Sequence, residues 1–328
     1  MNQHMRKVLT IILLTCLLTV SCGRRSGDGS GDGSGSVREF PSVQVPAVVG
    51  GQEEAMEYLT LHYWDAFTAG EGNWLCDSLH IAGVEATALE AEVGKYTTLL
   101  SMLPLETARK DVRAFCSRLE QAQRKDNGSN IFDGTLKMVS RYLYDPNSPV
   151  RNEDIYGALA LSLSESDCVG PDERERFARE AELCSRNAVG TVAADFSFIC
   201  RDGREMNLHS VKAPLTLLFF SNPGCPACAE ISRTLTDDPK VNSLLGDGTL
   251  AVVSIYIDEE IDEWMAHTGD WPAQWTVGYD PAMVIRESEL YVVRAIPSLY
   301  LLDSQKRVIM KDAVAEKLVQ WLQEYENQ

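Results

Sequence analysis

The sequence predicts an α+β protein: an all-α N-terminal domain followed by an α/β sandwich with a mixed central sheet. From about residue 45 to residue 186, apolar residues recur every three or four positions, which is the period of an amphipathic helix. After residue 193, continuous apolar runs alternate with helical patterns, as expected for strands buried on both faces of a sheet. With 328 residues, of which 45% are apolar, the chain is large enough for two packed domains.

The chain begins with a pattern typical of a targeting segment. A short basic start, "MNQHMRK", precedes "VLTIILLTCLLTV", an uncharged apolar run. This run suits a signal peptide and is short for a membrane span, which needs about 20 residues. We therefore expect residues 1–21 to be a signal peptide. The following "TVSC" resembles a lipobox, which predicts lipid attachment at Cys22, although Thr19 stands where that pattern prefers Leu. An ordinary secretory signal is the alternative.

Residues 22–44 are predicted to be a flexible tether, because "GRRSGDGSGDGSGS" offers almost no apolar surface to bury. A lipid anchor and a tether place the protein in the cell envelope, facing the periplasm, where disulfides persist. The formal charge is −18 and would become −20 without residues 1–21, which hold two basic residues and no acid. Such a surface repels phosphate backbones, so nucleic-acid binding is not expected.

Residues 45–190 are predicted to form a helical domain. Turn-forming stretches such as "DNGSN" and "YDPNSPVRNED" separate the helices, and Asn152 or Asp154 is suited to cap one of them. His62 and His80 are isolated, so each is more simply a packing or surface residue than a ligand. The domain contains no catalytic grouping and is interpreted as an interaction or scaffold domain. Its helical patterns cover residues 53–67, 88–103, 107–125, 155–166 and 171–188.

Residues 191–328 are predicted to form the α/β domain. It begins with a hairpin whose turn contains Asp202 and Gly203. The apolar run Leu215–Phe220 predicts a central strand, and the cysteine pair follows it directly. The remaining patterns predict a strand at 250–257, a helix at 258–268, strands at 297–303 and 306–310, and a closing helix at 313–326.

Cys225 and Cys228 form a Cys-x-x-Cys pair within "SNPGCPACAE". A structural metal site needs about four ligands, and no second pair at similar spacing exists. Covalently attached haem needs a histidine directly after the second cysteine, and this position is occupied by Ala229. A purely structural disulfide would close a very short loop and restrict the unfolded chain little. We therefore predict no metal, haem or other bound cofactor.

The position of the pair, between a buried strand and a helix, favours redox chemistry. Cys225 lies at the predicted helix N-terminus, where free backbone N–H groups and the helix dipole favour a thiolate. Pro226 suits the first helical position, because its missing N–H is not needed there. Cys228, one turn later, should be more buried. Disulfide exchange uses such an unequal pair: Cys225 attacks as the nucleophile and Cys228 resolves the mixed disulfide.

From about Ala193 to Gln328 the sequence resembles the thioredoxin superfamily. The resemblance rests on the strand, the Cys-Pro-Ala-Cys pair, the following helix and "RAIPSLYLLD". The early hairpin is similar to the TlpA/ResA-type branch. The resemblance implies a cis-proline at Pro297, after Ile296, beside the disulfide and with backbone open to a partner chain. A trans-proline at a strand start is the alternative.

Nearly the whole mature chain resembles lipoproteins of Gram-negative anaerobes that join an uncharacterised helical domain to a C-terminal thioredoxin-like domain. "RYLYDPNSPVRNEDIY" and "WTVGYD" carry this resemblance. It implies an envelope location and says little about the substrate. Together with the cysteine pair, the sequence predicts an envelope thiol–disulfide oxidoreductase that acts on protein thiols or disulfides and draws electrons from a membrane donor of the DsbD type. The TlpA-like resemblance favours a reductase. The alternative is a non-enzymatic lipoprotein scaffold or binding module. A peroxiredoxin-type peroxidase is disfavoured because "PxxxTxxC" is missing.

Two departures from the superfamily pattern affect the predicted mechanism. Phe219 stands where many thioredoxins carry a buried acid. The acids at 258–260 are candidates for a replacement base, although they are more simply the start of a helix. Pro226 and Ala227 replace Gly-Pro, so the direction of electron flow does not carry over. Trp271 and Trp275 either line the active-site groove or pack beside it. The remaining cysteines are expected to be unpaired buried thiols: Cys76, Cys116, Cys168, Cys184 and Cys200.

Overall fold

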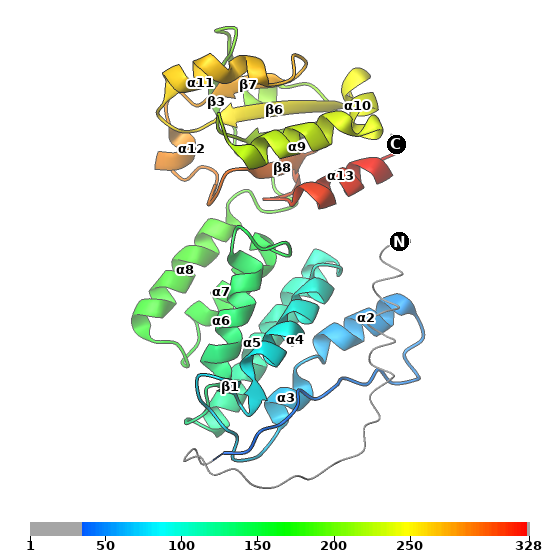
Figure 1. The fold of residues 1–328 in the computed structure, drawn as a ribbon, viewed down its shortest axis with the longest axis vertical. Helices are drawn as coiled ribbons and strands as arrows, with labels where there is room; N and C mark the ends of the chain where they lie inside the picture. Colours follow the sequence, from blue (N-terminus) through cyan, green and yellow to red (C-terminus); the bar gives the residue numbers. More distant parts are fainter. Residues whose placement is uncertain (1–34, 327–328) are drawn as a thin grey trace. The chain divides into compact units, whose positions relative to one another are not determined.

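The computed structural model describes residues 35–326, which form two compact units (Figure 1). The first contains the chain as far as Asp145 together with Leu161–Glu175. The second contains Pro146–Ala160 and the chain from Arg176 onward. The predicted signal peptide (1–21), the proposed lipid site Cys22 and the tether as far as residue 34 lie outside the described residues. Among the described residues, no helix combines the length and the apolar character needed to cross a bilayer.

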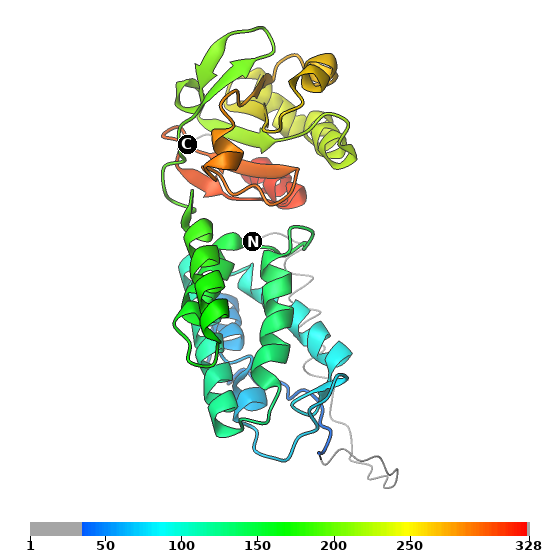
Figure 2. The ribbon, with the colours of Figure 1, turned by 90° about the vertical axis from the view of Figure 1, so that its left-hand side faces the viewer.

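The first unit is built from helices around an aromatic core, as expected for an all-α domain (Figure 2). Trp64, Phe67, Tyr96 and Phe115 are each at most 1% exposed, and their rings contact one another at centroid distances of 5.2–5.8 Å. Aromatic packing of this kind supplies much of the buried area of a small core. The elements are α2 (Gln52–Leu61), α3 (Asp65–Ala69), β1 (His80–Ile81), β2 (Val84–Glu85), α4 (Ala86–Leu100), α5 (Leu105–Lys125) and α6 (Ile131–Tyr144).

The segment Ser36–Phe40, within the predicted tether, packs on this first unit. The backbone N–H of Ser36 donates to the carbonyl of Asn73 at 2.8 Å. The Arg38 guanidinium donates to the carbonyls of Ala82 (2.7 Å) and Phe67 (3.0 Å). The Phe40 ring stacks on Phe67 with a centroid distance of 5.3 Å. These contacts place the start of ordered packing before residue 45, the predicted domain start.

The second unit contains a mixed sheet with strand order β4-β3-β7-β6-β5-β8-β9, as expected for the predicted sandwich. The central strands β5, β6 and β7 run parallel, whereas β3, β8 and β9 each pair antiparallel with a neighbour. The strands are β3 (Ser197–Cys200), β4 (Glu205–Asn207), β5 (Leu215–Phe220), β6 (Leu250–Tyr256), β7 (Thr276–Tyr279), β8 (Ser298–Leu302) and β9 (Val308–Met310).

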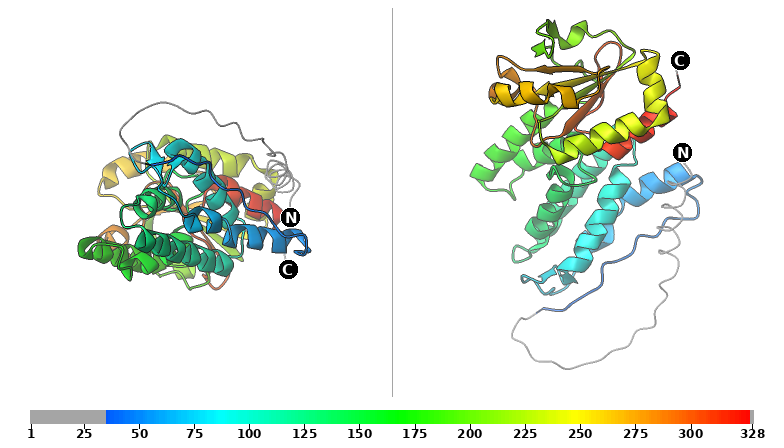
Figure 3. Two further views of the ribbon diagram at one scale, coloured as in Figure 1. Left: turned by 90° about the horizontal axis from the view of Figure 1, so that it is seen from below. Right: turned by 45° about the horizontal axis from the view of Figure 1, so that its top comes forward.

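Helices lie against this sheet (Figure 3). Two layers of buried apolar side chains pack on its two faces. Alternate residues of β5 enter opposite layers: Phe219 packs with α9, α10 and α13, and Phe220 packs with α12 and the chain before β5. This alternation follows from the two-residue period of a strand. The helices of the unit are α9 (Pro226–Asp237), α10 (Pro239–Gly246), α11 (Ile261–His267), α12 (Val284–Glu287) and α13 (Ala315–Glu324), with short 3-10 turns at Leu208–Ser210 and Thr268–Asp270.

Two helices contribute residues to both compact units: α7 (Glu153–Ser164) and α8 (Pro171–Ser185). Asn152 caps α7, because its Oδ1 accepts a hydrogen bond from the N–H of Ile155 at 3.0 Å. The boundaries between the two compact units therefore fall inside or next to these helices, and none falls at residue 190. The domain boundary predicted there remains a prediction about sequence organisation.

Candidate functional site

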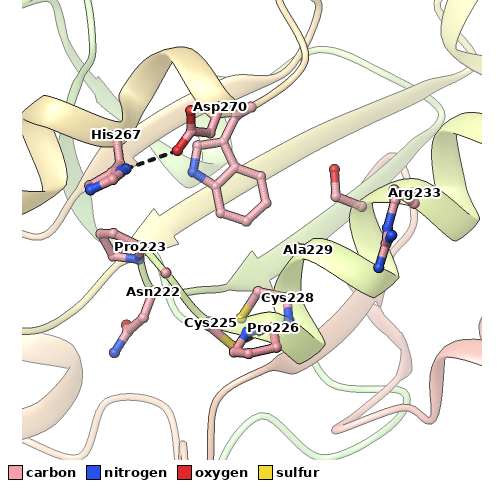
Figure 4. A pocket seen from close by; sticks show the side chains of 12 residues that line it. Asn222, Pro223, Cys225, Pro226, Cys228, Ala229, Arg233, His267 and Asp270 are labelled. Carbon is pink, nitrogen blue, oxygen red and sulfur yellow. Dashed lines mark hydrogen bonds and ion pairs between the residues drawn. The ribbon is translucent and has the colours of Figure 1, made fainter.

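The structure places Cys225 at the N-cap of α9, immediately before Pro226 at the first helical position (Figure 4). Its Sγ accepts a hydrogen bond from the backbone N–H of Cys228 at 3.2 Å. This N–H has no partner within the helix, so the sulfur performs the role that Ser or Asp plays at other helix starts. Gly224 allows the approach to the helix, with a φ of 67°.

Cys228 lies one turn into α9 and is 1% exposed, whereas Cys225 is only partly buried. Burial is the larger cause, and together with a hydrogen bond to Cys225 it raises the pKa of the Cys228 thiol to about 12. A backbone hydrogen bond with Asn222 acts in the opposite direction. The two sulfurs therefore differ in access, and the buried one is held as a thiol by its raised pKa, which is the arrangement expected of a resolving cysteine behind an accessible one.

The loop between β5 and α9 is held by hydrogen bonds at its start. Ser221 and Ser254, on adjacent strands, share a buried hydroxyl–hydroxyl hydrogen bond of 2.7 Å. The Asn222 side chain donates to Asp258 Oδ2 at 2.7 Å, and Arg286 also pairs with Asp258. This carboxylate, a candidate base by sequence, is thus engaged by an amide and a guanidinium. Glu260 occupies the N-cap of α11, a helix-start position.

The peptide bond between Ile296 and Pro297 is cis, which agrees with the thioredoxin resemblance. Ser298, the next residue, pairs with Phe220, the last residue of β5. Pro297 therefore lies at the end of the sheet where the cysteine loop begins. Ile296 packs against both apolar layers, including the one that contains Cys228.

An aromatic cluster occupies the place of the missing buried acid. Phe219 is fully buried, and its ring makes edge contacts with Trp271 and Trp275 at centroid distances of 5.6 and 6.2 Å. Trp275 is 2% exposed, so it belongs to the core. Trp271 is partly buried and forms one wall of the cavity beside the cysteines.

That cavity has a volume of about 510 Å³ and opens over both cysteines (Figure 4). Its walls combine apolar and polar groups: Pro226, Ala229 and Trp271 on one hand, and Asn222, Ser232, Arg233, His267 and Asp270 on the other. His267 Nδ1 lies 2.9 Å from Asp270 Oδ2. The lining does not include Ile296 or Pro297.

Arg201, at the end of β3, fixes the loop that carries Trp271. Its guanidinium donates hydrogen bonds of 2.9–3.3 Å to five backbone carbonyls between residues 268 and 275. Hydrogen bonds from a charged donor are stronger than neutral ones, so a single side chain organises this wall.

The sequence had not indicated four residues of the cavity wall: Ser232, Arg233, His267 and Asp270. The His-x-x-Asp spacing at the end of a predicted helix was a visible signal for the last two. Their position beside the cysteines depends on the fold of the 268–275 loop, which sequence periodicity does not reveal.

The other cysteines do not join this site. Cys116 and Cys184 are buried, and desolvation is the main cause that raises the pKa of each thiol to about 12. Cys200 is also buried, and Cys76 and Cys168 are partly so; all five are free thiols. Within residues 35–326, no cluster of His, Cys, Asp or Glu is arranged to hold a metal ion.

Comparisons with known proteins agree with this architecture. A family model described as "Domain of unknown function (DUF5106)" matches residues 19–187. A solved structure of a thioredoxin-like protein from Bacteroides caccae is 32% identical, with a TM-score of 0.76, over 89% of this chain and 100% of that chain. No curated protein matches the sequence.

Two further solved structures match over less of the chain. One is the C-terminal domain of an uncharacterised protein from Bacteroides fragilis, with 45% identity and a TM-score of 0.42 over 43% of this chain and 100% of that one. The other is a domain of a possible thiol-disulfide isomerase from Cytophaga hutchinsonii, with 25% identity and a TM-score of 0.36 over 42% of this chain and 92% of that one.

The fold and the paired cysteines define a thioredoxin-like protein. The chain belongs to the thioredoxin-like proteins that carry an N-terminal DUF5106 domain, as its match to the Bacteroides caccae structure and to the family model establishes. The predicted family and α+β fold class are thereby confirmed. Membership supports a thiol redox function in general terms.

Proposed function

We propose that the protein is a thiol–disulfide oxidoreductase of the cell envelope that reduces disulfides in polypeptides through Cys225 and Cys228. The observation that carries the proposal is the inequality of the two sulfurs: Cys225 is partly exposed at a helix N-cap, and Cys228 is buried with a pKa raised to about 12. A nucleophile that faces the substrate and a resolving thiol behind it are the two parts that exchange needs.

In the proposed reaction, the Cys225 thiolate attacks one sulfur of a substrate disulfide. A bond forms between Cys225 and that sulfur while the substrate S–S bond breaks, and the second substrate sulfur leaves as a thiolate. Cys228 then loses its proton and attacks Cys225 Sγ, which releases the first substrate sulfur. The substrate gains two electrons and two protons, and the protein becomes a disulfide that an external dithiol must reduce again.

The direction of electron flow and the location are the finer parts of the proposal. Their support is the likeness to TlpA-type proteins, the signal-like residues 1–21 and the lipobox-like sequence at Cys22. A membrane dithiol donor of the DsbD type is the proposed source of electrons. Incorporation of labelled fatty acid into the expressed protein, lost in Cys22→Ser, would test the anchor.

The proposed activity is tested by reduction of insulin disulfides with dithiothreitol as the electron source. We expect the wild-type protein to accelerate the reaction, Cys225→Ser to abolish the acceleration, and Cys228→Ser to accumulate a mixed disulfide visible by mass spectrometry. Cys76→Ser, which changes a thiol in the first unit, serves as the matched control. Equal rates in wild-type and Cys225→Ser would refute the activity. A redox titration of the pair in glutathione buffers then separates reductant from oxidant.

A further inference from the structure

A buried cluster of charged side chains lies in the second unit next to the cis-proline. Glu153 Oε1 is 2.7 Å from Nε of Arg294, and Glu153 Oε2 is 3.0 Å from Nζ of Lys311. The Lys311 ammonium also donates to the carbonyls of Cys184 (2.8 Å) and Arg186 (2.7 Å). One carboxylate on α7 thus binds two cations that flank strands β8 and β9 in the chain.

Because this cluster is buried, each of its charged groups needs a partner at close range. The side chains of Glu153 and Lys311 are each 1% exposed, and that of Arg294 is 15% exposed. Buried charges persist only where each has a partner at close range, because desolvation is costly. Removal of Glu153 alone would take from Arg294 and Lys311 the carboxylate that they share, which is the nearest anion to each of them.

The cluster reaches both sides of Pro297. Arg294 lies three residues before it in the chain. Ser298 follows it directly, and its hydroxyl donates to Asp312 Oδ1 at 3.0 Å. Asp312 Oδ2 in turn is 3.5 Å from Nη2 of Arg294 and 3.0 Å from Nε of Arg151. The cis-proline is therefore held between two residues that share one ion-pair network.

We propose that Glu153 is a positioning residue for the cis-proline segment, and that it acts through Arg294 to hold that segment where a polypeptide substrate would pair with it. The proposal rests on the proposed function and on the implication of the thioredoxin resemblance that the backbone beside Pro297 pairs with a partner chain. Glu153 is the first residue of α7, and the Asn152 cap fixes this turn. It follows that Pro146–Ala160, which precedes the predicted α/β domain, forms part of the redox unit.

The experiment compares three variants of the full chain. Glu153→Gln removes the charge and keeps the shape. Glu153→Gln combined with Lys311→Met removes one charge of each sign, which avoids leaving the buried Lys311 ammonium without its carboxylate. Glu182→Gln is the matched control, because Glu182 is an exposed glutamate on α8 that pairs with Arg179 and Arg186. Thermal unfolding establishes that each variant is folded at the assay temperature.

Two measured rates distinguish a positioning role of Glu153 from a general contribution to the folded structure. We expect both Glu153 variants to lose at least tenfold in kcat/KM for insulin reduction, mainly through KM, because the substrate pairs with the displaced segment. The rate constant for alkylation of Cys225 by iodoacetamide should stay within twofold of wild type, because this small reagent needs no pairing segment. Glu182→Gln should leave both rates unchanged.

Unchanged kcat/KM in both folded Glu153 variants would overturn the proposal, and so would a parallel fall in both rates. If the wild-type protein does not reduce insulin at all, the proposed function fails, and amide hydrogen exchange decides the positioning role separately. Faster exchange at Ile296 and Ser298 in both Glu153 variants then supports it, and exchange equal to that of wild type overturns it.

Discussion

The backbone N–H of Cys228 donates a hydrogen bond to Sγ of Cys225 at 3.2 Å. The two cysteines are thus in contact in the reduced protein, through the first turn of α9. This contact keeps Sγ of Cys225 at the helix start, where the free N–H groups of that turn point toward it. The Cys228 thiol lies in the core, and its raised pKa makes its deprotonation costly.

The first prediction concerns the pH dependence of the Cys228 thiol. Because burial raises its pKa to about 12, its thiolate should be only about one part in ten thousand at pH 8. In Cys225→Ser, the iodoacetamide alkylation rate of Cys228 should therefore rise about tenfold for each pH unit between 8 and 10. The same variant unfolded in urea should reach a plateau near pH 9 to 10, since an exposed thiol has a pKa of about 8.5. A plateau below pH 9 in the folded variant would contradict the prediction.

The second prediction concerns the aromatic ring in the place of the missing acid. Phe219→Leu removes the edge contacts with Trp271 and Trp275 and should lower the unfolding free energy by about 1–3 kcal/mol. It should also shift the tryptophan emission maximum to longer wavelength. Phe220→Leu is the matched control, because it is equally buried on the opposite face of the sheet. It should cost a similar unfolding free energy in urea titrations and leave the emission unchanged; an equal spectral shift in both variants would count against the contact.

The third prediction concerns the charge of the cavity wall. Arg233→Glu replaces a cation of the cavity wall with an anion, so reaction of Cys225 with the dianionic disulfide dithiobis(nitrobenzoate) should slow about fivefold at low salt. Reaction with the neutral disulfide dithiodipyridine should change less than twofold. Lys240→Glu, on α10 and outside the cavity lining, is the matched control and should affect neither rate. Equal slowing with both disulfides, measured by stopped-flow absorbance, would exclude a charge effect.

The fourth prediction concerns a buried carboxylate of the first unit. Asp111 is 3% exposed, and burial raises its pKa to about 6. The folded state therefore holds its proton more tightly than the unfolded state does. The stability that this provides is present below about pH 4 and is lost as the pH rises through 6, a change of about 2–3 kcal/mol.

Asp111→Asn should remove this dependence and raise the unfolding free energy at pH 7. Urea titrations at pH 4, 5, 6 and 7 measure both effects. A variant that is less stable than wild type at pH 7, or that keeps the full pH dependence, would show that the Asp111 carboxylate is better accommodated than its burial indicates.

The central strand and the cysteine turn were predictable because their signals are local. Leu215–Phe220 is one uninterrupted apolar run, and the structure buries all six residues in β5. The helix start at Cys225 follows from Pro226, which the first helical position tolerates. The predicted cis peptide at Ile296–Pro297 is present as well. The strand and the helix start depend on few residues that are adjacent in sequence, whereas the cis peptide was expected from the resemblance to the thioredoxin superfamily.

The features that were missed depend on distant contacts. Strand β7 is only four residues long and contains Gly278. A Cβ atom there would lie 2.7 Å from the Phe198 ring and 2.8 Å from the Ile199 carbonyl oxygen, so the close approach of β3 requires glycine. The single helix predicted for 53–67 is instead broken into α2 and α3 around His62–Trp64. The break lets the consecutive residues Tyr63 and Trp64 both enter the core, where a continuous helix would separate them by about 100°.

The contacts of Arg201 have a consequence for how this cavity can change during evolution. The Arg201 side chain binds only backbone carbonyls of the 268–275 loop. The backbone of the loop is therefore held from outside the loop, by an arginine that directly follows β3. Because these contacts involve no side chain of the loop, Asp270 can be exchanged without loss of them. The charge of one wall of the cavity can thus change while its backbone and the cysteine pair on α9 stay in place.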